Sequence, residues 1–145
     1  MTDHPNPITI TEAPPEAGHE IESQLLRDLR SELPQATNTG FVLTATDPHG
    51  ALVGGIVAGT SYGWLLTKCL WVAQGHRNAG LGRSLMARAE DKGRALGCHA
   101  AWLDTSSPAA MAFYTQLGYT PFGRLANHAG QRPATHCRWF MQKAL

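Results

Sequence analysis

Residues 70–82 read Leu70-Trp71-Val72-Ala73-Gln74-Gly75-His76-Arg77-Asn78-Ala79-Gly80-Leu81-Gly82. Apolar residues come first, turn residues follow, and two glycines stand directly before a helical pattern. Glycine has no Cβ atom, so the backbone at Gly80 and Gly82 can come close to a ligand. The first amides of a helix have no intrahelical partners and attract anions. The stretch therefore predicts a strand, a glycine-rich loop and a helix that together form an anion site.

Two arginines, Arg77 and Arg83, flank this loop and can add charge-assisted hydrogen bonds. A pyrophosphate suits such a site best. On glycine spacing alone, a tight strand-to-helix turn without a ligand is an equally good interpretation. The wider sequence has to decide between them.

Two other phosphate-binding loops fit less well. A Walker A loop needs Lys where Arg83 stands. A dinucleotide-binding loop needs a small residue where Leu85 stands, although Asp104 lies at a suitable distance for a ribose-binding acid. The residues before the loop also predict an antiparallel meander rather than the first half of a dinucleotide-binding domain.

The pattern before the loop predicts a short strand, a helix and three successive antiparallel strands. The strand is Ile8-Thr9-Ile10, and apolar residues at helical spacing over 21–33 form the helix, which Pro34 stops. The meander covers 41–46, 51–59 and 62–72, with turns at 47–50 and near Thr60-Ser61.

After the loop, the sequence predicts two helices alternating with strands. The first helix follows Gly82 and ends at Gly97, and the strand 99–104 comes next. The second helix is capped by Ser106 or Ser107 and ends at Gly118. Two final strands cover 119–125 and 135–143. We expect one α/β (α+β) domain with a mixed sheet over residues 1–145.

Composition excludes several classes of protein. With 43% hydrophobic and 16% charged residues, the 145-residue chain is of the globular type. The net charge of +1 disfavours a nucleic-acid binder, although five of the 12 basic residues fall between positions 77 and 94. Three cysteines without disulfide-like spacing indicate a reducing compartment. We expect a cytoplasmic protein with no secretory signal, no membrane span and no metal site.

Two motifs together resemble those of the GNAT acetyltransferase superfamily. The loop Arg77-Asn78-Ala79-Gly80-Leu81-Gly82 is similar to its phosphate-loop pattern, and residues 112–119, Ala-Phe-Tyr-Thr-Gln-Leu-Gly-Tyr, resemble its C-terminal helix motif. The resemblance is strong over about 70–123 and extends to the N-terminal third by element order alone. It implies a GNAT fold: a mixed, mostly antiparallel sheet, splayed centrally, with helices on both faces.

The resemblance also implies a cosubstrate and its binding residues. Acetyl-CoA would bind with its phosphates on Arg77, Asn78, Ala79, Gly80, Leu81, Gly82 and Arg83. The pantetheine arm would enter a gap between the strand ending at Val72 and the strand starting near His99. Backbone groups of Leu70, Trp71 and Val72 would bind that arm, and an amide near Leu70 would stabilise an oxyanion.

Catalytic roles follow from the same resemblance. Tyr114 stands where the family places its general acid, although the residue taken alone favours a core aromatic beside Phe113. Ser107 stands where many members have an asparagine that binds pantetheine; it is a donor there or only a helix cap. No general base is identifiable: Asp104, His99 and His76 are candidates by position, and a water chain is an alternative.

The sequence therefore predicts an N-acetyltransferase acting by direct attack of an amine on acetyl-CoA. A non-catalytic acyl-CoA sensor or scaffold is the alternative, and a dinucleotide-dependent oxidoreductase is a third class. The acceptor is an amine of unknown identity. Exposed edge strands favour a homodimer.

Overall fold

The computed structural model describes residues 6–33 and 38–145, and these form two units that are considered separately. The first unit contains one helix, α1 (Ala17–Glu32), which has the predicted apolar spacing. The predicted strand at Ile8–Ile10 is wrong, because these residues have no regular structure. A strand needs a hydrogen-bonded partner, and a β-prone triplet does not supply one. Pro34, the predicted helix stop, lies outside the described residues. One domain over residues 1–145 stays a prediction.

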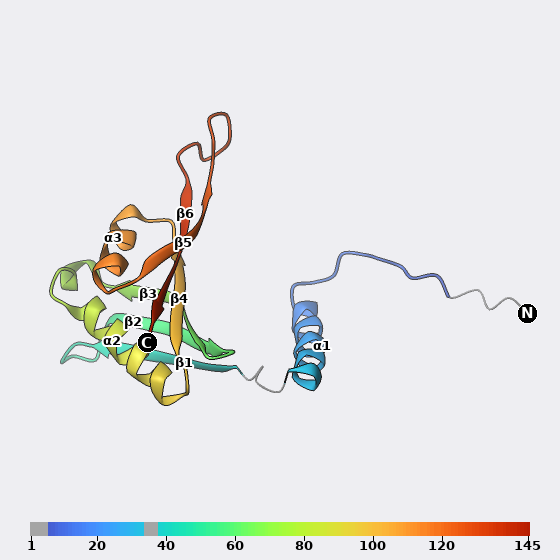
Figure 1. The fold of residues 1–145 in the computed structure, drawn as a ribbon, viewed down its shortest axis with the longest axis horizontal. Helices are drawn as coiled ribbons and strands as arrows, with labels where there is room; N and C mark the ends of the chain where they lie inside the picture. The colour runs from blue at the N-terminus through green and yellow to red at the C-terminus, as the bar shows by residue number, and fades with distance from the viewer. Residues whose placement is uncertain (1–5, 34–37) are drawn as a thin grey trace, which may run out of the picture. The chain divides into compact units, whose positions relative to one another are not determined.

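The second unit is built on a six-stranded sheet in the order β1-β2-β3-β4-β6-β5 (Figure 1). Its strands are β1 (Thr39–Thr46), β2 (Leu52–Ser61), β3 (Trp64–Val72), β4 (Ala100–Thr105), β5 (Thr120–Ala126) and β6 (Cys137–Ala144). Four of the five strand pairs are antiparallel, and β3 with β4 is parallel. The mixed, mostly antiparallel sheet is as predicted.

Two helices, α2 (Leu81–Ala95) and α3 (Pro108–Gln116), pack on the same face of this sheet. Their buried side chains share one core cluster with β2, β3, β4 and β6. Leu85, Met86 and Ala89 of α2 and Tyr114 of α3 belong to it. Among the residues of this unit, the opposite sheet face has no helix on it, and we call it the open face. A helix on that face stays a prediction.

The turn between β2 and β3 differs from the predicted one. β2 continues to Ser61, which pairs with Trp64, so the two turn residues are Tyr62 and Gly63. Both have positive φ, 53° and 81°, as a type I′ hairpin turn requires. Glycine adopts this conformation easily, whereas Tyr62 gave no sequence signal for it.

Candidate active site

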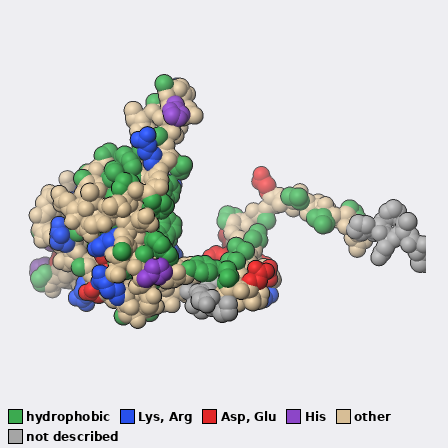
Figure 2. Space-filling view, in the orientation of Figure 1, with side chains coloured by type: hydrophobic (Ala, Val, Ile, Leu, Met, Phe, Trp, Pro, Cys, Tyr) green, Lys and Arg blue, Asp and Glu red, His purple; other side chains and the backbone are tan. Residues whose placement is uncertain are grey.

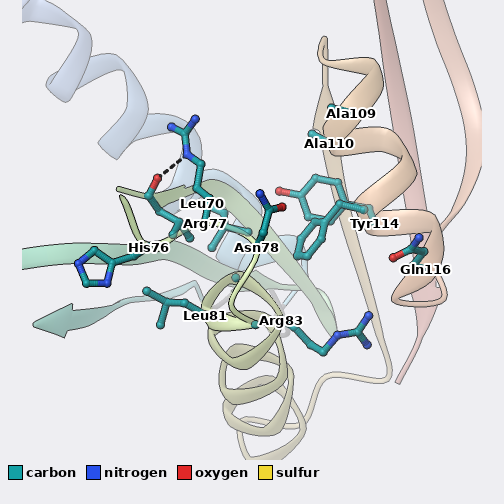
Figure 3. A pocket seen from close by; sticks show the side chains of 14 residues that line it. Leu70, His76, Arg77, Asn78, Leu81, Arg83, Ala109, Ala110, Tyr114 and Gln116 are labelled. Atoms are coloured by element: carbon teal, nitrogen blue, oxygen red, sulfur yellow. Dashed lines mark hydrogen bonds between the residues drawn. The ribbon is translucent and has the colours of Figure 1, made fainter. Parts of the chain in front are cut away.

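A cavity of about 610 Å³ lies where the loop before α2 faces α3 (Figure 3). Its walls come from three places: the end of β3, the loop with the first turn of α2, and one side of α3. Ten residues that the sequence singled out line it: Leu70, Val72, His76, Arg77, Asn78, Gly80, Leu81, Gly82, Arg83 and Tyr114. The fold thus gathers two distant motifs around one space.

The N-terminus of α2 opens toward this cavity. Gly80 is the N-cap residue, with φ of 85°, and Asn78 also has a positive φ of 61°. The hydrogen bond from the Ser84 amide to the Gly80 carbonyl, 3.0 Å, is the first of the helix. The three amides before Ser84 therefore precede the helical ladder and are available to an anion.

The two glycines of the loop serve different purposes. Gly80 needs its left-handed conformation, and a Cβ there would meet nothing within 4 Å. At Gly82, a Cβ would lie 3.3 Å from Cζ of Phe113 and 3.7 Å from Cγ2 of Val72. Gly82 thus allows α3 to pack against the first turn of α2, which the sequence alone did not indicate.

The two arginines extend in different directions from the loop (Figure 3). Arg77 donates from Nε to the Val72 carbonyl at 2.9 Å, which fixes the guanidinium beside the end of β3. Arg83 lines the cavity and also a neighbouring cavity of about 400 Å³. Both arginines line the cavity toward which the N-terminus of α2 opens, so both place positive charge on its walls.

The sheet is splayed beside this cavity. β3 and β4 pair only from Trp64 to Leu66 and from Ala100 to Trp102. Beyond these residues each strand pairs on its outer side alone, β3 with β2 and β4 with β6. The splay is as predicted, and the β4-facing edge of β3 from Thr67 to Val72 has no strand partner. The binding of a ligand to this edge stays a prediction.

Tyr114 projects from α3 into the cavity and is 8% exposed. Phe113 and Tyr119 pack edge-on against its ring, with centroid distances of 5.2 and 5.9 Å. Burial raises the pKa of the Tyr114 phenol above its ordinary value, and a charge on Cys69 raises it further. The phenol is therefore protonated at neutral pH and is able to donate a proton.

Three predicted binding residues lie outside the cavity lining. Trp71 points away because side chains alternate along β3 and both neighbours, Leu70 and Val72, line the cavity. Ala79 is a loop residue that does not line the cavity. Ser107 caps α3, accepting a hydrogen bond from the Ala110 amide at 3.2 Å. Their binding roles stay predictions.

The three candidate bases lie in different parts of the second unit. His76 lines the cavity on the loop side. His99 stacks edge-on with Trp64 at 5.7 Å, at the paired end of β3 and β4 and away from the splay. Asp104 lies two residues past the last residue of β4 that pairs with β3. The structure does not bring the three together.

Four further residues of α3 line the cavity and had no assigned binding role: Ala109, Ala110, Phe113 and Gln116. The two alanines follow the cap at Ser107, where small side chains leave room beside the loop. Such positions could have been found from the capping signal combined with helical spacing. The contact of Phe113 with Gly82 joins two elements and had no local signal.

In fold and site geometry, this chain is an acetyltransferase domain. It belongs to the acetyltransferase (GNAT) family, whose model matches residues 8–119. The family uses acetyl-CoA. In the described part of the chain, no helix is long and apolar enough to cross a membrane. The same residues contain no group of three or more metal-ligating side chains placed to share an ion.

Named relatives are similar over part of their length. The chain is 35% identical over 83 residues to the acetyltransferase Atu2258 of Agrobacterium fabrum, covering 57% of this chain and 61% of the relative. It is 41% identical over 80 residues to blasticidin-S acetyltransferase of Streptomyces morookaense, covering 54% and 59%. The matches span about three fifths of these relatives. A crystal structure from Agrobacterium tumefaciens, described as a candidate acetyltransferase, has a TM-score of 0.83 at 26% identity, covering 97% of this chain and 99% of that one.

Proposed function

We propose that this protein transfers an acetyl group from acetyl-CoA to an amine by direct attack, with Tyr114 as the general acid. One observation carries the proposal: a single cavity is lined by the N-terminal turn of α2, by Arg77 and by the Tyr114 side chain, beside the splay of β3 and β4. Family membership and the two named relatives support it.

The donor fits the parts of this site in order. The pyrophosphate of acetyl-CoA would bind the amides at the start of α2, with Arg77 and Arg83 alongside. The pantetheine arm would run along the free edge of β3 toward Tyr114. An extended chain of amides can pair with a strand edge as another strand does.

The transfer reaction then requires a proton on the sulfur of the leaving group. The amine nitrogen forms a bond with the acetyl carbon, and the carbon–sulfur bond breaks to leave a thiolate. The Tyr114 Oη, protonated at neutral pH, donates its proton to this sulfur as the bond breaks. A phenol (pKa about 10) is a weaker acid than a thiol (about 8.5), so the transfer is completed when the phenolate regains a proton. A proton lost from the amine returns the site to neutrality.

A variant with Tyr114→Phe tests this function. We expect kcat to fall about ten- to a hundredfold while the KM for acetyl-CoA changes less than about twofold, because the ring packing is kept. Thiol release from acetyl-CoA with a panel of primary amines is the measurement. Tyr62→Phe is the matched control, since Tyr62 is 44% exposed in a hairpin turn.

Two outcomes would contradict the proposal. An unchanged kcat in Tyr114→Phe would remove this residue from the mechanism. Binding of CoA without thiol release, with every amine of the panel, would favour an acyl-CoA sensor or scaffold. The relative named blasticidin-S acetyltransferase makes antibiotic-like amines the first acceptors to include.

We further propose a cytoplasmic homodimer. The three cysteines, all free in the described residues, support a reducing compartment. The edge strands β1 and β5 of the sheet support self-association. Light scattering on the purified chain measures the mass, and a monomer at all concentrations would contradict the dimer.

A further inference from the structure

The end of α3 folds the chain back so that Tyr119 lies on Tyr114. Gly118 has a positive φ of 97°, and its amide donates to the Thr115 carbonyl at 3.1 Å. The Tyr119 amide donates to the Tyr114 carbonyl, also at 3.1 Å. These two bonds form a Schellman motif, in which the residue after the glycine packs on a residue of the last helical turn. Here those two residues are Tyr119 and Tyr114.

The Tyr119 ring is a fixed neighbour of the Tyr114 ring. The two ring planes are inclined at 66°, with the edge of one ring against the other. Tyr119 is enclosed by protein on all sides, and Phe113 contacts the Tyr114 ring in the same edge-on manner. Protein interiors are close-packed, so two such neighbours leave a ring few alternative positions.

A buried ion pair between α2 and β6 packs against the Tyr119 ring. Figure 2 shows Lys and Arg side chains exposed where Figure 1 draws α2, but Glu90 of the same helix is only 4% exposed. Its two carboxylate oxygens accept hydrogen bonds from Lys143 Nζ at 2.6 and 3.0 Å. The Lys143 Cε lies 3.5 Å from where Gly118 would carry a Cβ, and its Nζ lies 5.6 Å from the Tyr119 ring centroid. The lysine therefore lies against both the turn and the ring.

This ion pair has a fixed geometry. Either charge alone would be buried without a partner, which is strongly unfavourable, so the two side chains stay together. Through Lys143 and Tyr119, the pair connects α2 and β6 with the ring of Tyr114. The surroundings of Tyr114 are thus fixed by three separate elements of the fold.

The direction of the Tyr114 hydroxyl depends on its rotamer. An aromatic residue in a helix adopts χ1 near 180° or near −60°, and these two rotamers place the hydroxyl at different points. Tyr114 lines the cavity, and its hydroxyl points toward the loop before α2 (Figure 3). A displacement of about 1 Å at a reacting group can lower a rate about a hundredfold. A neighbour that excludes the second rotamer therefore affects the rate.

We propose that Tyr119 is a positioning residue for the general acid. Its ring, held by the Glu90–Lys143 pair, restricts Tyr114 to the rotamer that directs the hydroxyl into the cavity. Tyr119 itself does not line the cavity, so it acts through Tyr114. This inference rests on the proposed function, in which Tyr114 donates the proton. It gives the turn at Gly118 a role beyond ending α3.

NMR couplings that report χ1 test the positioning without turnover. In the full chain saturated with CoA, three-bond couplings from Cγ of Tyr114 to its backbone nitrogen and carbonyl carbon give the rotamer populations. We expect one rotamer in the wild type and in Tyr119→Phe, which keeps the ring. In Tyr119→Leu, the second rotamer should rise to about 10% of the population or more.

Kinetic measurements separate positioning from a general structural role. In Tyr119→Leu, kcat should fall about five- to tenfold while the KM for acetyl-CoA changes less than about twofold. Tyr119→Phe should restore kcat to within about twofold of the wild type. Leu65→Ala is the matched control, because Leu65 is fully buried against Gly93 at the paired end of β3. Its loss should lower stability and leave kcat unchanged.

A double-mutant cycle shows whether Tyr119 acts through the hydroxyl of Tyr114. In a Tyr114→Phe background, Tyr119→Leu should not lower kcat further, because no hydroxyl is left to position. Should Tyr119→Leu not fold, Tyr119→Met takes its place with the same expectations, since its longer side chain fills more of the space.

Three results would overturn the inference. They are equal proportional losses of kcat in both backgrounds, a single Tyr114 rotamer in Tyr119→Leu, and an equal loss of kcat in Leu65→Ala. The failure of the proposed function looks different. If Tyr114→Phe alone keeps the kcat of the wild type, the general acid is contradicted, and the couplings still decide whether Tyr119 restrains Tyr114.

Discussion

Tyr119 occupies an unusual position in the core of the second unit. It is 1% exposed, and in the described residues its hydroxyl is the one buried side-chain polar atom without a hydrogen-bond partner. The Glu90–Lys143 pair lies beside it, with Lys143 Nζ 2.6 Å from Glu90 Oε1 and 5.6 Å from the Tyr119 ring centroid. The Tyr119 ring is therefore well packed, whereas its hydroxyl oxygen lacks a hydrogen bond.

We expect Tyr119→Phe to stabilise the protein. A buried hydroxyl without a partner costs about 1–3 kcal/mol, and phenylalanine keeps the ring contacts with Tyr114. The free energy of unfolding in urea at pH 7 should rise by about 1 kcal/mol. Tyr62→Phe, at an exposed turn, should leave it unchanged. A clear loss of stability in Tyr119→Phe would show that the hydroxyl has a partner, such as an internal water.

The same substitution should change the alkaline behaviour. Burial and the Glu90 charge raise the pKa of Tyr119 in the folded state. The folded state then holds a proton that the unfolded state loses above pH of about 10. Stability is therefore lost as the pH rises above this value, and Tyr119→Phe should reduce the slope of that loss.

At the scale of elements, α2 and α3 meet at Gly82. We expect Gly82→Ala to lower the free energy of unfolding by about 1 kcal/mol and to weaken CoA binding about threefold, because the new Cβ pushes against Phe113. Gly75→Ala in the same loop is the control, since a Cβ there meets nothing within 4 Å. Calorimetric titration with CoA measures the binding.

A second substitution shows whether the contact is the cause. In the double variant Gly82→Ala with Phe113→Leu, the shorter side chain leaves room for the Cβ, and part of the CoA affinity should return. Strictly additive effects in this double-mutant cycle would contradict a direct contact. The loss of CoA affinity in Gly82→Ala would then come from a change in the first turn of α2 itself.

Elements with local signals were predicted well from the sequence. The loop and the start of α2 depend on glycine chemistry within a few residues, and so do the Ser107 cap and the ends of α2 and α3 at Gly97 and Gly118. The strand at Ile8–Ile10 failed because pairing, and not propensity, makes a strand. The turn at Tyr62 and Gly63 was predicted at the wrong position, because only Gly63 gave a sequence signal for it.

The candidate site was predictable in part for the same reason. Residues of one motif are close in sequence, so the loop and Tyr114 could be named in advance. The contact of Gly82 with Phe113 and the place of Asp104 at the splay depend on how separate elements pack. No local pattern encodes such contacts. Trp71 could have been separated from Leu70 and Val72 by strand alternation alone.

At the scale of the molecule, the two described units differ in charge. Residues 6–33 contain six acidic and two basic residues, whereas residues 38–145 contain four acidic and ten basic residues. The second unit therefore has a net charge of +6, although the net charge of the whole chain is only +1. That unit contains the anion site.

We expect this charge to accelerate the arrival of an anionic ligand. The association rate of CoA should fall several-fold between about 0.02 and 0.2 M NaCl, because salt screens the attraction. Stopped-flow measurements give the rate. Pantetheine, which has no phosphate, is the control and should bind at a rate nearly independent of salt. An equal salt response of both ligands would contradict steering by the phosphate groups.

The short pairing of β3 with β4 also leaves part of the β3 backbone without a hydrogen-bond partner in the sheet. Three residue pairs hold the strands together at one end, and past Leu66 and Trp102 the sheet has no backbone ladder across the gap. The amides of β3 that face β4 beyond Leu66 therefore depend on water for their hydrogen bonds in the free protein. We expect them to exchange their hydrogens with solvent more readily than the paired amides of the same strand.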